Sequence, residues 1–163
     1  MAKRSAGLLL YRGARDGLEV FLVHPGGPLW AGRDDGAWSI PKGEFDEGED
    51  ALEAAKREFG EETGLSVAGP FQPLEPVRQP SGKLVYAWAA RSDADAGAIK
   101  SNTFAMEWPK GSGRTLEFPE VDRAGWFPVA GARRKLLKGQ VPFVDQLQRY
   151  LSLRPRRRTV SKM

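Results

Sequence analysis

Cysteine is absent from this chain of 163 residues, and histidine occurs once. The lack of cysteine excludes a disulfide framework and a zinc site built on thiolates. Long hydrophobic runs are also missing, because the apolar stretch near the start ends at Tyr11 and Arg12. That stretch is too short for a signal peptide or a membrane span. We therefore expect a cytoplasmic protein with no membrane partner.

The acidic and basic residues are unevenly distributed. The segment 154–163, RPRRRTVSKM, holds five of the 25 basic residues and no acidic one, so the rest of the chain is close to neutral. Such a tail can contact nucleic acid or another acidic surface, although a flexible, solvated end is the favoured interpretation. No repeat or internal linker interrupts the chain. We expect one domain over 1–153, followed by this basic tail.

The pattern of apolar and turn residues predicts strands and helices in irregular order. Expected strands lie at 5–12, 18–24, 38–41, 83–90, 102–108 and 123–129. The segment 131–153 is expected to form two helical pieces, divided near Gly139 and Pro142. With 40% hydrophobic and 28% charged residues, the composition is typical of a folded domain. The predicted class is α/β in the broad sense (α+β), with a sheet covered by helices.

The clearest predicted helix begins after Asp50, in the segment ALEAAKREFGEE. Asp50 with Glu53 three residues later forms a capping-box pattern, and Gly64 provides a natural end. Leu52 and Phe59, with Ala55 between them, recur at helical spacing and predict a narrow buried stripe.

Three carboxylates lie beside that stripe. At 100° per residue, Glu58, Glu61 and Glu62 fall within an arc of about 100°. Like charges at this spacing repel one another, and a bound cation would relieve the repulsion. An exposed, solvated acidic face is the alternative interpretation. Oxygen ligands without cysteine favour a hard cation, Mg²⁺ or Mn²⁺, and protein-bound Mg²⁺ commonly also binds substrate phosphates.

The same residues belong to a longer pattern that resembles the Nudix box, G-x5-E-x7-R-E-U-x-E-E-x-G-U, where U is a bulky apolar residue. The matching residues are Gly43, Glu49, Arg57, Glu58, Phe59, Glu61, Glu62, Gly64 and Leu65. The resemblance implies the Nudix fold, a mixed β-sheet sandwiched between α-helices. It also implies a Mg²⁺-dependent hydrolase that acts on phosphoanhydride bonds.

The resemblance further assigns roles to individual residues. Glu58, Glu61 and Glu62 are the implied Mg²⁺ ligands, together with the carbonyl oxygen of Gly43. Glu58 is our choice for the residue that orients or deprotonates the attacking water, with Glu61 and Arg57 beside it in the catalytic set. Glu49 and Arg57 are expected to form a structural pair.

Two residues outside this pattern extend the predicted site. Many Nudix proteins place another glutamate on a loop shortly before a tryptophan, and Glu117 and Glu120 both precede Trp126. Spacing favours Glu120 as a catalytic and metal-binding residue. Lys42, next to Gly43, is a candidate for phosphate binding or an ordinary surface lysine.

Gly60 is unusual inside a helix, and one explanation is the close approach of a neighbouring segment.

The substrate is less constrained by the sequence. The segment WSIPKG resembles the lead-in of Nudix enzymes that cleave dinucleoside polyphosphates, such as diadenosine tetraphosphate, to AMP and ATP. Trp38 and Tyr86 are candidates for stacking on a base, as are Trp30 and Trp88, although packing roles are more common for such residues. Nucleoside triphosphates, ADP-ribose and RNA 5′ ends are alternative substrates. A catalytically silent nucleotide sensor is a further alternative, disfavoured because every glutamate of the box is present.

Overall fold

The computed structural model describes residues 3–153, so the predicted basic tail at 154–163 lies outside the described residues. Within 3–153, none of the helices has the length and apolar character that spanning a bilayer requires.

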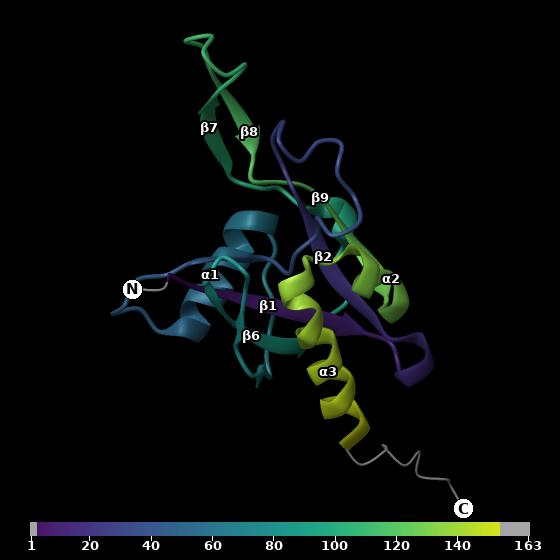
Figure 1. Cartoon of the computed structure of the whole chain (residues 1–163). Coiled ribbons are helices and arrows are strands. Elements are labelled where there is room, and N and C mark those ends of the chain that lie inside the picture. The colour runs from purple at the N-terminus through teal and green to yellow at the C-terminus, as the bar shows by residue number, and fades with distance from the viewer. Residues whose placement is uncertain (1–2, 154–163) are drawn as a thin grey trace, which may run out of the picture.

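A seven-stranded mixed sheet forms the centre of the molecule (Figure 1). Its main path runs β4-β6-β1-β2-β9, with β3 paired to β1 and β5 paired to β6. The β1–β6 pair is parallel, whereas β1–β2 and β2–β9 are antiparallel. The strands are β1 (Arg4–Arg12), β2 (Glu19–Pro25), β3 (Lys42–Glu44), β4 (Gln72–Pro73), β5 (Val77–Arg78), β6 (Leu84–Arg91) and β9 (Val121–Pro128).

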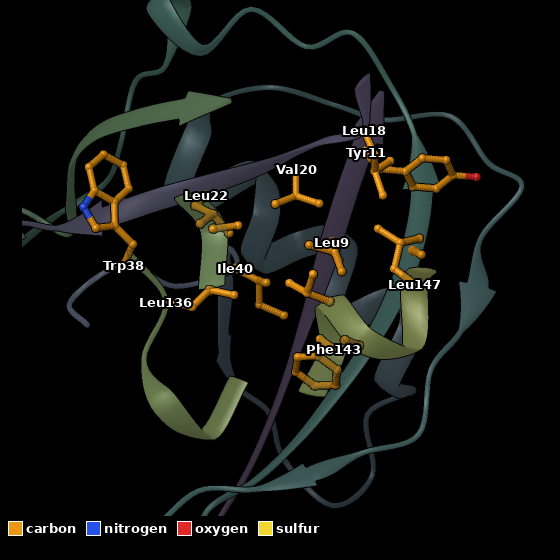
Figure 2. Close-up of a cluster of buried hydrophobic side chains, with 14 of the residues drawn as sticks. Leu9, Tyr11, Leu18, Val20, Leu22, Trp38, Ile40, Leu136, Phe143 and Leu147 are labelled. Carbon is orange, nitrogen blue, oxygen red and sulfur yellow. The ribbon is translucent and has the colours of Figure 1, made fainter. Parts of the chain in front are cut away.

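Helices cover both faces of this sheet. Helix α1 (Ala51–Thr63) packs on one face through Ala54, Ala55 and Phe59. Helices α2 (Val129–Lys135) and α3 (Val141–Leu153) pack on the other. Figure 2 shows Phe143 and Leu147 of α3 against the apolar side chains of β1 and β2. Short 3-10 turns occur at Arg15–Gly17, Ala96–Ala98 and Lys138–Gln140. The predicted mixed sheet between helices is confirmed.

The central position of β1 follows from its composition. Residues 5–11 of this strand are all buried, because α1 covers one face and α3 the other. A strand that is buried on both faces needs a nearly continuous apolar run, and SAGLLLY provides one.

The predicted ends of α1 are also confirmed. Asp50 Oδ2 accepts a hydrogen bond from the Glu53 backbone N at 3.0 Å, and Gly64 adopts the left-handed conformation at φ 72°. The break in the C-terminal helical region falls at residues 136–140, and Pro142 lies in the first turn of α3, where a proline is tolerated.

Two sequence expectations differ from the structure. Residues 38–41 form isolated bridges, Val23 with Ser39 and Trp38 with Leu136, and the regular strand begins only at Lys42. Residues 115–119, for which the sequence predicts no element, form β8 (Thr115–Pro119), paired with β7 (Thr103–Glu107). This hairpin projects from the body of the molecule (Figure 1). Four of the five residues of β8 are exposed, so burial imposes no strong apolar pattern on this strand.

Candidate active site

The site is built around a contact between Gly43 on β3 and Glu58 on α1. A Cβ placed on Gly43 would lie 1.5 Å from Oε1 of Glu58 and 2.1 Å from its carboxyl carbon. The carboxylate therefore rests directly on the strand backbone, and only glycine leaves room for it. This close approach explains why the predicted pattern begins with glycine.

Arg57 holds the neighbouring carboxylates in place. Its Nε and Nη2 donate to the two oxygens of Glu49 at 2.9 and 3.2 Å, a bidentate pair that ties the 45–50 loop to α1. Its Nη1 donates to Glu58 Oε2 at 2.6 Å and to Glu61 Oε2 at 3.1 Å. The expected Glu49–Arg57 pair is present, and Arg57 also orients two of the predicted ligands.

Burial and repulsion from neighbouring carboxylates raise the pKa of two side chains of the site, Glu58 and Glu62. Burial, followed by the nearby carboxyl group of Glu61, raises the pKa of Glu58 to about 7, while Arg57 opposes the shift. Burial raises the pKa of Glu62 to about 8, with the charges of Glu58 and Glu120 adding to it and Lys42 opposing it. The backbone N of Lys42 donates to Glu62 Oε1 at 3.2 Å.

Glu120 reaches the cluster from the turn between β8 and β9. It lines the same cavity as Glu62, and partial burial together with the charge of Glu61 raises its pKa. Its backbone is fixed on both sides, since its N donates to the Asn102 carbonyl at 2.8 Å and its carbonyl accepts from Gly26 N at 2.9 Å. Glu117, the alternative considered from the sequence, lies on β8 and faces the hydroxyl of Thr103.

The predicted substrate-binding residues lie in three different environments. Trp38 is only 4% exposed, donates from Nε1 to Asp34 and packs edge-on against Phe127, which favours a packing role over base stacking. Tyr86 is half-buried and packs edge-on against Phe45. Lys42 is largely buried, and this burial lowers its pKa.

Two other residues have roles that differ from the simplest expectations. A Cβ on Gly60 would meet only the carbonyl oxygen of Leu65, at 3.9 Å, so the suggested close approach of a neighbouring segment is wrong. His24 is fully buried, with Nδ1 2.9 Å from Asp122 Oδ1 and Nε2 2.6 Å from the Arg33 carbonyl. It has a structural role, because it attaches the loop after β2 to β9.

The acidic cluster has the chemistry of a site for a hard cation. Among residues 3–153, no three histidine or acidic side chains converge closely enough to hold an ion. Instead, the Arg57 guanidinium lies between Glu58 and Glu61 as a cationic partner. Oxygen donors whose ionised forms repel one another fit Mg²⁺ or Mn²⁺. Glu58, Glu61, Glu62 and Glu120, with the Gly43 carbonyl, are the residues that would hold it.

An apolar cavity of about 380 Å³ borders the cluster. Its lining consists of residues 25–30, Phe104 and Met106 of β7, and the two acidic residues Glu62 and Glu120. Phe104 and Met106 were not singled out from the sequence, although alternate apolar residues in NTFAMEW indicate one apolar face of a strand. Residues 25–30, which line the same cavity, lie more than 70 positions away in the chain, so the sequence does not show that the two segments are close.

A model of the NUDIX domain matches residues 1–147. Two curated relatives show sequence similarity. An RNA pyrophosphohydrolase of Caulobacter vibrioides is 44% identical over 57 residues, which cover 32% of this chain and 33% of the relative. An 8-oxo-(d)GTP phosphatase of Mycolicibacterium smegmatis is 33% identical over 144 residues, covering 82% of this chain and 37% of the relative. The chain thus spans about a third of the length of these relatives.

Solved structures agree on the fold. An Ap4A hydrolase binary complex from C. elegans superposes with a TM-score of 0.63 at 21% identity, covering 93% of this chain and 98% of that one. The NUDIX domain of Shewanella oneidensis NrtR, crystallised with ADP ribose, gives a TM-score of 0.64 at 17% identity, covering 93% and 89%. The resemblance inferred from the Gly43–Leu65 pattern is confirmed, and the chain belongs to the NUDIX domain family.

Proposed function

We propose that this protein is a divalent-cation-dependent pyrophosphohydrolase that cleaves a nucleoside diphosphate linked to a further group. The observation that carries the proposal is the seating of Glu58 on Gly43, with Arg57 bridging Glu58 and Glu61. A carboxylate that packs on the strand backbone and accepts a hydrogen bond from Arg57, within a cluster of three further acidic residues, is suited to positioning water beside a polyphosphate. NUDIX hydrolases generally use Mg²⁺ or a similar ion.

The reaction needs a water molecule, a phosphorus atom and a leaving phosphate in line. Glu58 orients the water and accepts its proton as the water oxygen attacks phosphorus. The bridging P–O bond then breaks, and its electron pair leaves with the departing phosphate. The cation, when bound, supplies positive charge that offsets charge developing on the phosphate oxygens. Arg57 and Glu49 keep Glu58 and Glu61 in position, and Lys42 remains a candidate partner for the leaving phosphate.

Dinucleoside polyphosphates such as diadenosine tetraphosphate are our preferred substrates. The WSIPKG lead-in supports this choice, and so does the structural likeness to the C. elegans Ap4A hydrolase. Tyr86 remains a candidate for contact with one of the two bases. It does not line the cavity beside Glu62, so that contact would be made elsewhere. Nucleoside triphosphates are the second candidate, because a relative that aligns with 82% of this chain is an 8-oxo-(d)GTP phosphatase.

A product-release assay tests both levels of the proposal. The purified protein is incubated with Mg²⁺ or Mn²⁺ and a panel of dinucleoside polyphosphates, triphosphates, ADP-ribose and 5′-triphosphorylated RNA, and products are identified by mass. We expect diadenosine tetraphosphate to give AMP and ATP with the highest kcat/KM. A higher kcat/KM for a triphosphate would overturn the substrate choice alone. If neither wild type nor Glu62→Gln cleaves any phosphoanhydride of the panel, the pyrophosphohydrolase assignment is wrong.

A further inference from the structure

The cavity beside the acidic cluster is preformed by contacts between two segments distant in the sequence. Gly26 donates from its backbone N to the Glu120 carbonyl at 2.9 Å, and a Cβ on it would lie 2.0 Å from the Pro119 carbonyl oxygen. Gly27 has φ +96°, and a Cβ there would lie 2.9 Å from Cζ of Phe104. The two glycines of the PGG segment thus allow the loop after β2 to lie directly against the β7–β8 hairpin.

Two aromatic rings that line the cavity each contact a neighbouring side chain. The guanidinium of Arg33 lies 5.6 Å from the ring centroid of Trp30, and turn hydrogen bonds link Trp30 to Gly27 and Arg33. Phe104 packs against Phe118 of β8, with ring centroids 6.0 Å apart. The loop that carries Trp30 is also anchored by His24 through the Arg33 carbonyl. These supports reduce the ordering that a ligand would have to impose on the wall.

The lining of the cavity is partly apolar and partly acidic. Trp30, Phe104 and Met106 make most of it apolar, whereas Glu62 and Glu120 belong to the predicted cation site. A ligand that fits this lining has a flat apolar ring and phosphates that would share a cation with the glutamates. A volume of about 380 Å³ lies within the usual range of small-molecule sites.

We propose that this cavity binds a nucleobase of the substrate, with Trp30 and Phe104 as the base-contacting residues. The proposal rests on the proposed function, because it takes the phosphates to lie at the glutamate cluster. Met106 completes the wall with a flexible, polarizable side chain that adapts to different ring shapes. This cavity, and not the buried side chain of Trp38, is therefore the proposed site of base recognition.

Pairs of ligands that differ only in the base test this assignment. The affinities of AMP, GMP, CMP and UMP are each compared with that of ribose 5-phosphate by isothermal titration calorimetry in Mg²⁺. We expect at least one monophosphate to bind about 10-fold or more tightly than ribose 5-phosphate, the ratio that base–aromatic stacking typically gives. Trp30→Ala and Phe104→Ala should each reduce that preference by about 10-fold and leave ribose 5-phosphate binding unchanged. Trp30→Phe should retain most of it.

Leu116→Ala provides the matched control. Leu116 pairs with Met106 across the hairpin, so it shares the same face of the hairpin, but it does not line the cavity. This variant should keep the full preference for the base. If wild type binds every monophosphate no more tightly than ribose 5-phosphate, or if both alanine variants retain the preference, the cavity assignment is wrong. Neither result would affect the hydrolase proposal, which depends on product release.

Discussion

The acidic helix edge and the apolar cavity lie side by side, but they are built in opposite ways. The helix edge comes from one continuous stretch, Gly43–Leu65, in which charged side chains are held by hydrogen bonds from Arg57. The cavity comes from the loop after β2 and from a projecting hairpin, and it is held by backbone contact at Gly26 and Gly27. We expect residues of the helix edge to control turnover and residues of the cavity to control substrate affinity.

The largest expected effect is at Glu62, the most buried of the predicted ligands. Glu62→Gln should lower kcat by about 100-fold or more, since it removes one charge from the cation site. Because burial raises the pKa of Glu62 to about 8, the neutral amide should leave the stability at pH 8 unchanged or higher. Steady-state kinetics and urea denaturation measure the two effects. Wild-type turnover at saturating Mg²⁺ would contradict the ligand assignment.

Gly43→Ala tests whether the seat of the Glu58 carboxylate on β3 is needed for turnover. The added methyl group would overlap the Glu58 carboxylate, and displacement of that group should reduce kcat by about 100-fold. Gly60→Ala in the same motif is the matched control, because nothing lies close to its Cβ. It should keep wild-type kcat and gain up to about 1 kcal/mol of stability. Equal losses of kcat in the two variants would show that the contact with Glu58 is not the cause.

Gly27→Ala tests the role of the apolar cavity. Its methyl group would press on the ring of Phe104 and strain a backbone at φ +96°. Because the cavity wall is altered and the glutamates are not, we expect KM for nucleotides to rise about 10-fold with kcat within about twofold. A drop in kcat as large as that of Gly43→Ala would mean that the two regions do not act separately.

The smallest expected effect is a pH dependence of stability without divalent cations. Folding raises the pKa of Glu58 to about 7 and of Glu62 to about 8, so the folded state binds more protons than the unfolded chain above the ordinary glutamate pKa. The free energy of unfolding should therefore fall as the pH rises from 5 to 8, by at least about 1 kcal/mol. Urea denaturation in EDTA measures it. Mg²⁺ at pH 8 should restore stability, and Glu62→Gln should flatten the dependence.

The sequence predicts the two regions unequally well, for a physical reason. Helical periodicity places Glu58, Glu61 and Glu62 together, because residues three and four apart share a face whatever surrounds the helix. Glu120 could be chosen only by resemblance, since its position depends on the β8–β9 turn. Phe104 and Met106 could be placed on one face of a strand, but not against the segment that they contact. Their neighbours come from the loop after β2, and alternation along a strand does not reveal what lies opposite.

The base of the β7–β8 hairpin is connected to the end of α1 by two backbone hydrogen bonds. Lys100 N donates to the Thr63 carbonyl at 2.7 Å, and Asn102 N donates to the Glu61 carbonyl at 2.9 Å. Backbone bonds of this kind do not depend on side-chain identity. The hairpin can therefore diverge in sequence and length during evolution, or be exchanged by engineering, while its attachment beside the carboxylates stays the same. On the proposal that the cavity binds a base, substrate range is set in part by a replaceable segment.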